Sequence, residues 1–187
     1  MDALIPAFIA VLLAEMGDRT QNRVHQLGLT FPNHIPIYAA LILVTTFNLL
    51  IGAVGGMLIA KLITFEARTL FAGLALMFGG VPMLFKIKLA RPINAKRPFL
   101  TSLVHIIPAQ IAGTAPFIVA GFAARSNMAG LTFAAGFAAV MITAIPPLLL
   151  REEWPGGVPL VALRRIAAAL LIGAGLWMAL GALRLIQ

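Results

Sequence analysis

The sequence contains no cysteine among its 187 residues. This absence excludes disulfides, iron–sulfur clusters and zinc sites built on thiolates. A glycine-rich phosphate loop, a His-Glu-x-x-His zinc motif and a nucleophile elbow are also missing. Without these motifs, the sequence gives no indication of an ATPase or of any other enzyme.

Charged residues are scarce as well, at 11% of the chain, whereas 61% of the residues are hydrophobic. A soluble domain carries about 25% charged residues, so this composition does not suit a surface that faces water. The apolar runs approach or exceed the roughly 20 residues that cross a membrane as a helix, and they lack the alternation of a β-barrel. We expect an all-α membrane protein, a single transmembrane domain over residues 1–187, with six transmembrane helices at about 3–25, 36–60, 68–86, 99–123, 129–150 and 162–185.

The basic residues predict how these helices are oriented. Ten of the 14 lysines and arginines fall on the side reached after the first, third and fifth helices. Because cytoplasmic loops are enriched in Lys and Arg, we expect this side in the cytoplasm and both termini outside, in a bacterial inner membrane. The largest group is a basic loop at about residues 86–98, which we interpret as a topology anchor; binding of anionic lipid or of a partner is the alternative.

A weak internal repeat divides the chain. Residues 8–15 align with residues 103–110, and residues 74–79 align with residues 170–175. Two units of three helices each have opposite orientations, because three is an odd number. We therefore predict two inverted three-helix repeats, at about 1–86 and 99–187, an arrangement typical of secondary transporters with a site at the midplane.

Two acidic residues, Glu15 and Asp18, lie within an expected helix. Their spacing predicts both carboxylates on one helix face. An ionisable group in hydrocarbon costs several kcal/mol unless it is paired or faces a polar cavity. The apolar run ends just before Glu15, which predicts a discontinuous helix around Gly17, and carboxylate oxygens are ligands suited to Mn²⁺ or Ca²⁺. The alternative is a helix end at the membrane surface, where the acids pair with Arg19 or Arg23.

Residues 15–21 read Glu-Met-Gly-Asp-Arg-Thr-Gln. They resemble the Glu-x-Gly-Asp-Lys/Arg-Ser/Thr signature of the Gdt-type cation exchangers, which include Golgi Mn²⁺/Ca²⁺–proton exchangers and bacterial manganese exporters. The resemblance implies two inverted three-helix repeats, each normally opening with this motif. It also implies a secondary transporter that exports a divalent cation, Mn²⁺ or Ca²⁺, in exchange for protons and needs no cofactor. Glu15 and Asp18 would be the metal ligands, supported by Gly17, Thr20 and Gln21.

The second half departs from this signature. Residues 109–115 read Ala-Gln-Ile-Ala-Gly-Thr-Ala, which places Gln110 at the glutamate position and Gly113 at the aspartate position. A site normally built from four carboxylates would keep two, completed by the Gln110 amide oxygen and the Thr114 hydroxyl. Two negative charges still balance one divalent cation, although its affinity should fall. A partner subunit or a second copy of the chain is an alternative source of acids.

Other polar residues in the expected helices are weaker candidates. Asn48 and His105 could support the site, but hydrogen bonding between helices is the simpler interpretation of Asn48, and a hydrogen-bonded or interfacial histidine that of His105. Gly52 and Gly56 predict a packing face. Prolines at positions 82, 108, 116, 146 and 147 are expected to kink or break their helices.

Two other function classes are compatible with these patterns. One is a LysE-like exporter of a small organic cation or an amino acid, which suits one carboxylate pair in a polar, uncharged cavity. The other is a membrane subunit without transport activity of its own, for which the altered second half would be the sign.

Overall fold

The computed structural model describes residues 4–85, 93, 96–154 and 160–185, and these residues form helices and no strand. The basic loop at about 86–98 falls largely outside the described residues. The α-helices are α1 (Leu4–Glu15), α2 (Arg19–Thr30), α3 (Ile35–Ala60), α4 (Phe65–Gly80), α5 (Pro98–Ile111), α6 (Ala115–Ser126), α7 (Ala129–Leu150) and α8 (Leu160–Ala182), with short 3₁₀ helices η1 (Val81–Leu84) and η2 (Arg151–Glu153).

The first expected helix is interrupted where its sequence changes from apolar to charged. Helix α1 ends at Glu15 and α2 begins at Arg19. Gly17 has a φ of 68°, in the left-handed region that favours glycine and that commonly ends a helix. The predicted discontinuity is confirmed, but the prediction that Glu15 and Asp18 share one helix face is wrong, because this turn puts them on opposite sides of a break.

The fourth expected helix, at about 99–123, is also broken, as expected from Pro108 and Pro116, which flank the break. Helices α5 and α6 are separated by residues 112–114 and meet at an angle of 52°. Pro116 lies in the first turn of α6, where its missing N–H costs no helical hydrogen bond. Pro108, by contrast, lies inside α5, and Pro146 and Pro147 lie inside α7 without ending it.

Four helical segments are long and apolar enough to cross a membrane, namely 35–60, 65–84, 129–150 and 161–182, and the bent pair of α5 and α6 could add a fifth. Many large apolar side chains on them are exposed, including Ile51 at 71% and Trp177 at 71%. Such a surface is stable in lipid rather than in water, so the chain is an integral membrane protein. The expected first helix at 3–25 is not among these segments, because α1 is short and α2 is polar.

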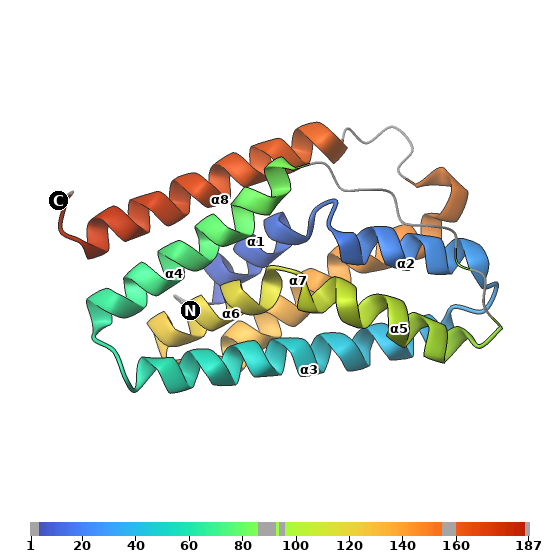
Figure 1. The fold of residues 1–187 in the computed structure, drawn as a ribbon, viewed down its shortest axis with the longest axis horizontal. Coiled ribbons are helices and arrows are strands. Elements are labelled where there is room, and N and C mark those ends of the chain that lie inside the picture. The colour runs from blue at the N-terminus through green and yellow to red at the C-terminus, as the bar shows by residue number, and fades with distance from the viewer. Residues whose placement is uncertain (1–3, 86–92, 94–95, 155–159, 186–187) are drawn as a thin grey trace.

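Small residues allow the helices to approach closely. A side chain at Gly73 or Gly175 would collide with the backbone of the facing helix where α4 and α8 pack together (Figure 1). The same holds for Gly52 and Gly56 of α3, which face the backbone of α6. The predicted packing face on α3 is therefore confirmed, and contacts of this kind hold helices together in a membrane.

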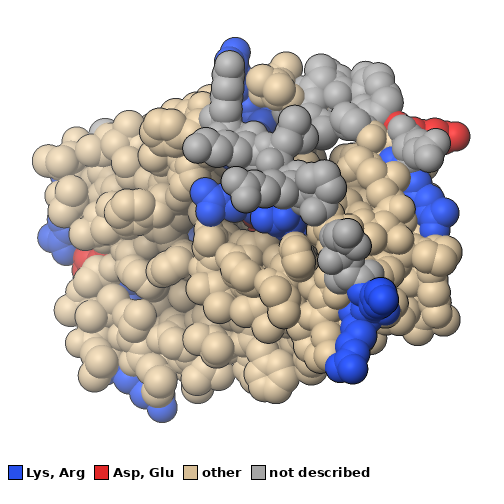
Figure 2. Space-filling model, turned by 45° about the vertical axis from the view of Figure 1, so that its right-hand side comes forward, with Lys and Arg blue, Asp and Glu red and all other residues tan. Residues whose placement is uncertain are grey.

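Both described ends of the chain lie at the same end of the molecule (Figure 1). The two broken helices run in opposite directions, α1 and α2 away from that end and α5 and α6 toward it (Figure 1). Figure 2 shows a face made mostly of residues that are neither basic nor acidic, with Lys and Arg atoms gathered near its middle and toward its right-hand side. The breaks are thus placed within an otherwise apolar bundle.

Candidate functional site

Glu15 is the last residue of α1 and is buried, with 4% of its surface exposed. Helix α1 packs against α7, α6 and α8, so this carboxylate lies between segments from both halves of the chain. Asp18 lies three residues further along, on the other side of the break. A buried carboxylate so close to another one requires a counter-charge or a proton.

Asp18 occupies the N-cap position of α2. The free N–H groups and the dipole at a helix start favour a negative charge there. One carboxylate oxygen, Oδ2, is buried and has no hydrogen-bond partner among the described residues. A buried oxygen that lacks a partner is costly, so Asp18 has capacity to bind a proton or a cation.

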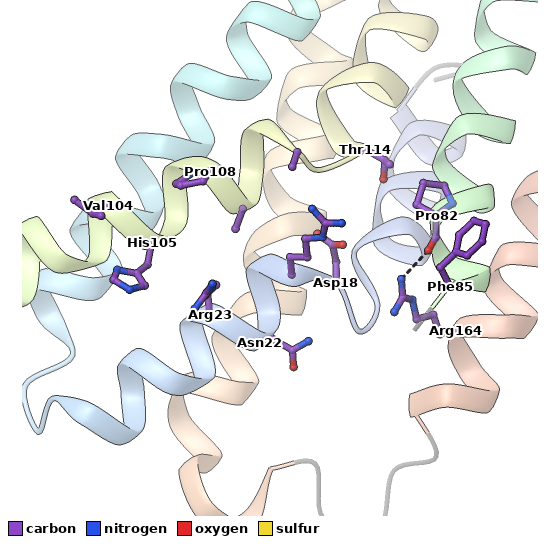
Figure 3. A pocket seen from close by; sticks show the side chains of 13 residues that line it. Asp18, Asn22, Arg23, Pro82, Phe85, Val104, His105, Pro108, Thr114 and Arg164 are labelled. Carbon is purple, nitrogen blue, oxygen red and sulfur yellow. Dashed lines mark hydrogen bonds between the residues drawn. The ribbon is translucent and has the colours of Figure 1, made fainter. Parts of the chain in front are cut away.

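Asp18 also lines a pocket of about 660 Å³ (Figure 3). Three guanidinium groups and this single carboxylate give the described wall a basic character. The wall is contributed by the α1–α2 break and α2, by η1 and the residue after it, by α5, by the α5–α6 break and by α8. Its residues are Asp18, Arg19, Asn22, Arg23, Pro82, Phe85, Val104, His105, Pro108, Ala109, Ala112, Thr114 and Arg164.

Gln110 is buried near the end of α5, with 5% of its surface exposed. Its Nε2 donates to the Thr45 hydroxyl over 2.7 Å, which orients the amide and leaves the oxygen Oε1 for another partner. The Asn48 side chain donates to the Gln110 backbone oxygen over 3.0 Å. Asn48 therefore links α3 to α5, as the helix-bonding interpretation predicted, and α3 holds Gln110 through both its side chain and its backbone.

Thr114 occupies the N-cap position of α6 and lines the same pocket as Asp18. Sequence alignment places Gly113 opposite Asp18, but the helix starts pair Thr114 with Asp18 instead. Each of these residues directly precedes a helix of 12 residues. The two breaks thus present a carboxylate from the first half and a hydroxyl from the second half to one pocket.

The remaining motif residues have different environments. Gln21 Oε1 accepts from the Gly17 N–H over 2.8 Å, and Gln21 Nε2 donates to the Thr143 backbone oxygen over 2.9 Å. Gln21 therefore fastens the break to α7 and supports the site. The buried Thr20 hydroxyl has no hydrogen-bond partner in the part of the chain that the structure describes.

His105 lines the pocket from α5, and its Nδ1 lies 2.9 Å from the Thr101 backbone oxygen. Because a carbonyl only accepts, Nδ1 carries the proton of this bond. Neither Glu15 nor Asp18 forms a salt bridge within the described ranges, where the observed ion pair joins Arg184 and Glu66 at 3.8 Å. The alternative interpretation expects Glu15 or Asp18 to pair with Arg19 or Arg23, and no such ion pair is present among the described residues.

The predicted site residues are brought together only in part. Asp18, Thr114 and His105 share the pocket, whereas Glu15 and Gln110 are buried and do not line it. Among the residues that the structure describes, no three His, Cys, Asp or Glu side chains gather as a metal-binding group. An occupied site would therefore need backbone, amide and hydroxyl oxygens, or a movement that brings Glu15 to the pocket.

Sequence reasoning missed Arg164, which reaches the pocket from α8. In the sequence it appears as one more basic residue at the start of the last helix. Its distance from the motif in the chain hides the fact that it stands beside Asp18. Thr45 and Thr143 were likewise recognisable only as polar residues, because their partners depend on tertiary packing.

Part of the chain matches a known protein family. The family model "Divalent cation/proton antiporter GDT1" matches residues 3–90, which include the broken helix, Glu15 and Asp18. No curated protein and no solved structure matches the chain at a significant level. The resemblance that the motif at residues 15–21 indicates is thereby confirmed, on the first half of the chain.

Proposed function

We propose that this chain, whose residues 3–90 match the divalent cation/proton antiporter family, is a secondary transporter that exports a divalent cation in exchange for protons. The observation that carries the proposal is the Asp18 carboxylate, which lines a pocket within an apolar helix bundle and has one buried oxygen without a described partner. Buried Glu15 lies across the same break. Such groups in a membrane mark an ion or proton pathway.

The architecture we propose is a single domain of six transmembrane helices, arranged as two inverted repeats at about 1–86 and 99–187. Each repeat would begin with a broken helix, α1–α2 in the first and α5–α6 in the second. The opposite directions of these broken helices and the common end of both termini support this arrangement (Figure 1). Inverted repeats with discontinuous helices form ion sites near the midplane of many transporters.

In the proposed mechanism, protons and the metal compete for the oxygens of Glu15 and Asp18. A cytoplasmic divalent cation displaces the protons, the two halves change their relative position, and protons from outside displace the cation. Two carboxylates carry two negative charges, so the exchange of up to two protons for one divalent cation is electroneutral. Gln110 Oε1 and the Thr114 hydroxyl would complete the oxygen ligands.

The substrate we favour is Mn²⁺, with Ca²⁺ as the second candidate, because both bind carboxylate, amide and hydroxyl oxygens. The basic residues of the first, third and fifth connections would lie in the cytoplasm of a bacterial cell and both termini outside. The α2–α3 connection and the end of α7 lie at the end of the molecule opposite both termini, which supports this orientation (Figure 1).

The test is proton movement in proteoliposomes loaded with a pH-sensitive dye. Addition of Mn²⁺ or Ca²⁺ should change the internal pH only when the chain is present, whereas an equal concentration of lysine should not. Exchange of labelled lysine without a metal response would favour the organic-cation exporter. Absence of any flux, with a partner that co-purifies in equal amount, would favour the membrane subunit without its own activity.

A further inference from the structure

Arg164 joins the second half of the chain to the break in the first half. It extends from the first part of α8 into the pocket, and its Nη2 donates to the Pro82 backbone oxygen over 3.0 Å (Figure 3). Its Cδ lies 3.5 Å from the place that a Cβ on Gly17 would occupy. The glycine therefore leaves space for the arginine stem, and one side chain connects α8, η1 and the α1–α2 break.

The charge of Arg164 is only partly satisfied. Its Nε is buried without a hydrogen-bond partner among the described residues, as is Asp18 Oδ2. Both groups line the same pocket, although the described contacts include no salt bridge between them. The bond to Pro82 holds the guanidinium at the pocket that the Asp18 carboxylate also lines (Figure 3).

This placement gives the two buried acids a resident counter-charge. Glu15 and Asp18 together would carry two negative charges, and Arg164 offsets one of them. A divalent cation offsets both, so a site that held the cation and an unmoved Arg164 would have an excess positive charge. In a medium of low dielectric constant that excess is costly.

We propose that Arg164 is a positioning residue for the exchange, the counter-charge that a bound divalent cation must displace. Displacement breaks the bond to Pro82, which links α8 to η1, so binding of the cation alters a contact between the two halves. When the cation leaves, Arg164 returns and offsets one carboxylate, and a single proton neutralises the other. This inference rests on the proposed function and identifies the group through which the second half senses the ion in the first half.

The neighbouring Arg165 provides a matched control. It is exposed, whereas Arg164 is half-buried, and it does not line the pocket. Arg164→Gln and Arg164→Met remove the charge, and the methionine also retains an apolar stem over Gly17. Arg164→Lys retains the charge and a donor for Pro82. Arg165→Gln removes an equal charge one residue away.

The experiment is a titration of the purified full chain with Mn²⁺, in which electron paramagnetic resonance measures free Mn²⁺. Loss of the displaced charge should tighten binding in Arg164→Gln and Arg164→Met by roughly 5–150-fold, the usual range of coupling between sites. Arg165→Gln and Arg164→Lys should bind as the wild type does. A merely structural role predicts weaker or unchanged binding, because removal of a structural contact does not tighten a site.

A wild type that binds Mn²⁺ while both neutral variants bind it equally or more weakly would overturn the role of Arg164 alone. A wild type that binds neither Mn²⁺ nor Ca²⁺ would overturn the proposed function and the inference together. Should neither neutral variant fold, hydrogen exchange of the wild type decides: Mn²⁺ should accelerate exchange in the first turns of α8, and unchanged or slower exchange would contradict the displacement.

Discussion

The two broken helices share a backbone plan and differ in chemistry. In the first, α1 ends at Glu15 and Asp18 precedes α2; in the second, Gln110 lies near the end of α5 and Thr114 precedes α6. A carboxylate–carboxylate pair in the first half thus corresponds to an amide–hydroxyl pair in the second. The break itself does not require charge, since a glycine turn or a proline at a helix start produces it. Charge is required only for the chemistry that we assign to the first half.

The largest difference should appear when each half loses its polar groups. We expect Glu15→Gln or Asp18→Asn to reduce Mn²⁺-driven proton movement by more than about 100-fold, because loss of a group outside the ligand shell alone costs roughly 10–100-fold. Thr114→Val, in the second half, should stay within that range. The measurement is dye-reported pH change in proteoliposomes, and Glu66→Gln, an exposed acid on α4, is the control. Equal losses in both halves would break the comparison.

The turns at the two breaks should differ in stability. Gly17→Ala forces an alanine to a φ of 68°, which should lower the free energy of unfolding by about 1–2 kcal/mol. Gly113 is not among the residues of positive φ, so Gly113→Ala should cost less, although its added Cβ would lie tightly against the Gln110 backbone oxygen at 3.0 Å. Unfolding in mixed micelles measures both, and a greater loss for Gly113→Ala would contradict this account of the first break.

The second half can be made to resemble the first. Thr114→Asp places a carboxylate at the start of α6, where an acidic cap is favourable. Facing the same pocket as Asp18, it should tighten Mn²⁺ binding by about tenfold, or about 1.4 kcal/mol. Calorimetric titration tests this, with Thr69→Asp, at a half-buried site on α4 that does not line the pocket, as the control. Weaker binding by a folded Thr114→Asp protein would show that Thr114 does not face the ion.

The smallest effect concerns the support of Gln110. Thr45→Val removes the hydroxyl that accepts from Nε2, and the buried amide loses a hydrogen bond worth about 1 kcal/mol. Thermal unfolding in detergent should register this loss, whereas Thr69→Val, whose hydroxyl bonds only within α4, should leave stability nearly unchanged. An unchanged melting temperature for Thr45→Val would mean that Gln110 is not held in this way.

The sequence predicts the first break better than the second. Charge and glycine at Glu15, Gly17 and Asp18 interrupt an apolar run, and this interruption is visible without a structure. The second break has no charge, so within residues 99–123 only Pro108 and Pro116 indicate an interruption. Asp18 and Thr114 correspond because each directly precedes a helix, which only the structure reveals. The sequence alignment instead pairs Asp18 with Gly113, one residue earlier.

Sequence patterns do not reveal which distant segments contribute side chains to the pocket. Arg164 and Asp18 are far apart in the chain, and their meeting depends on how α8 packs beside η1. A basic residue at the start of a membrane helix has the same appearance whether it anchors the helix or faces a buried acid. Packing glycines such as Gly52 and Gly56 were predictable, since small residues four apart form a face on any helix.

The central claim is that one divalent cation and protons share Glu15 and Asp18. Calorimetric titration with Mn²⁺ in two buffers of different ionisation enthalpy counts the protons released per ion bound. We predict proton release by the wild type, up to two per ion, and neither binding nor release by the chain that carries both Glu15→Gln and Asp18→Asn. Mn²⁺ binding by that double variant with wild-type affinity, or wild-type binding without proton release, would contradict the account.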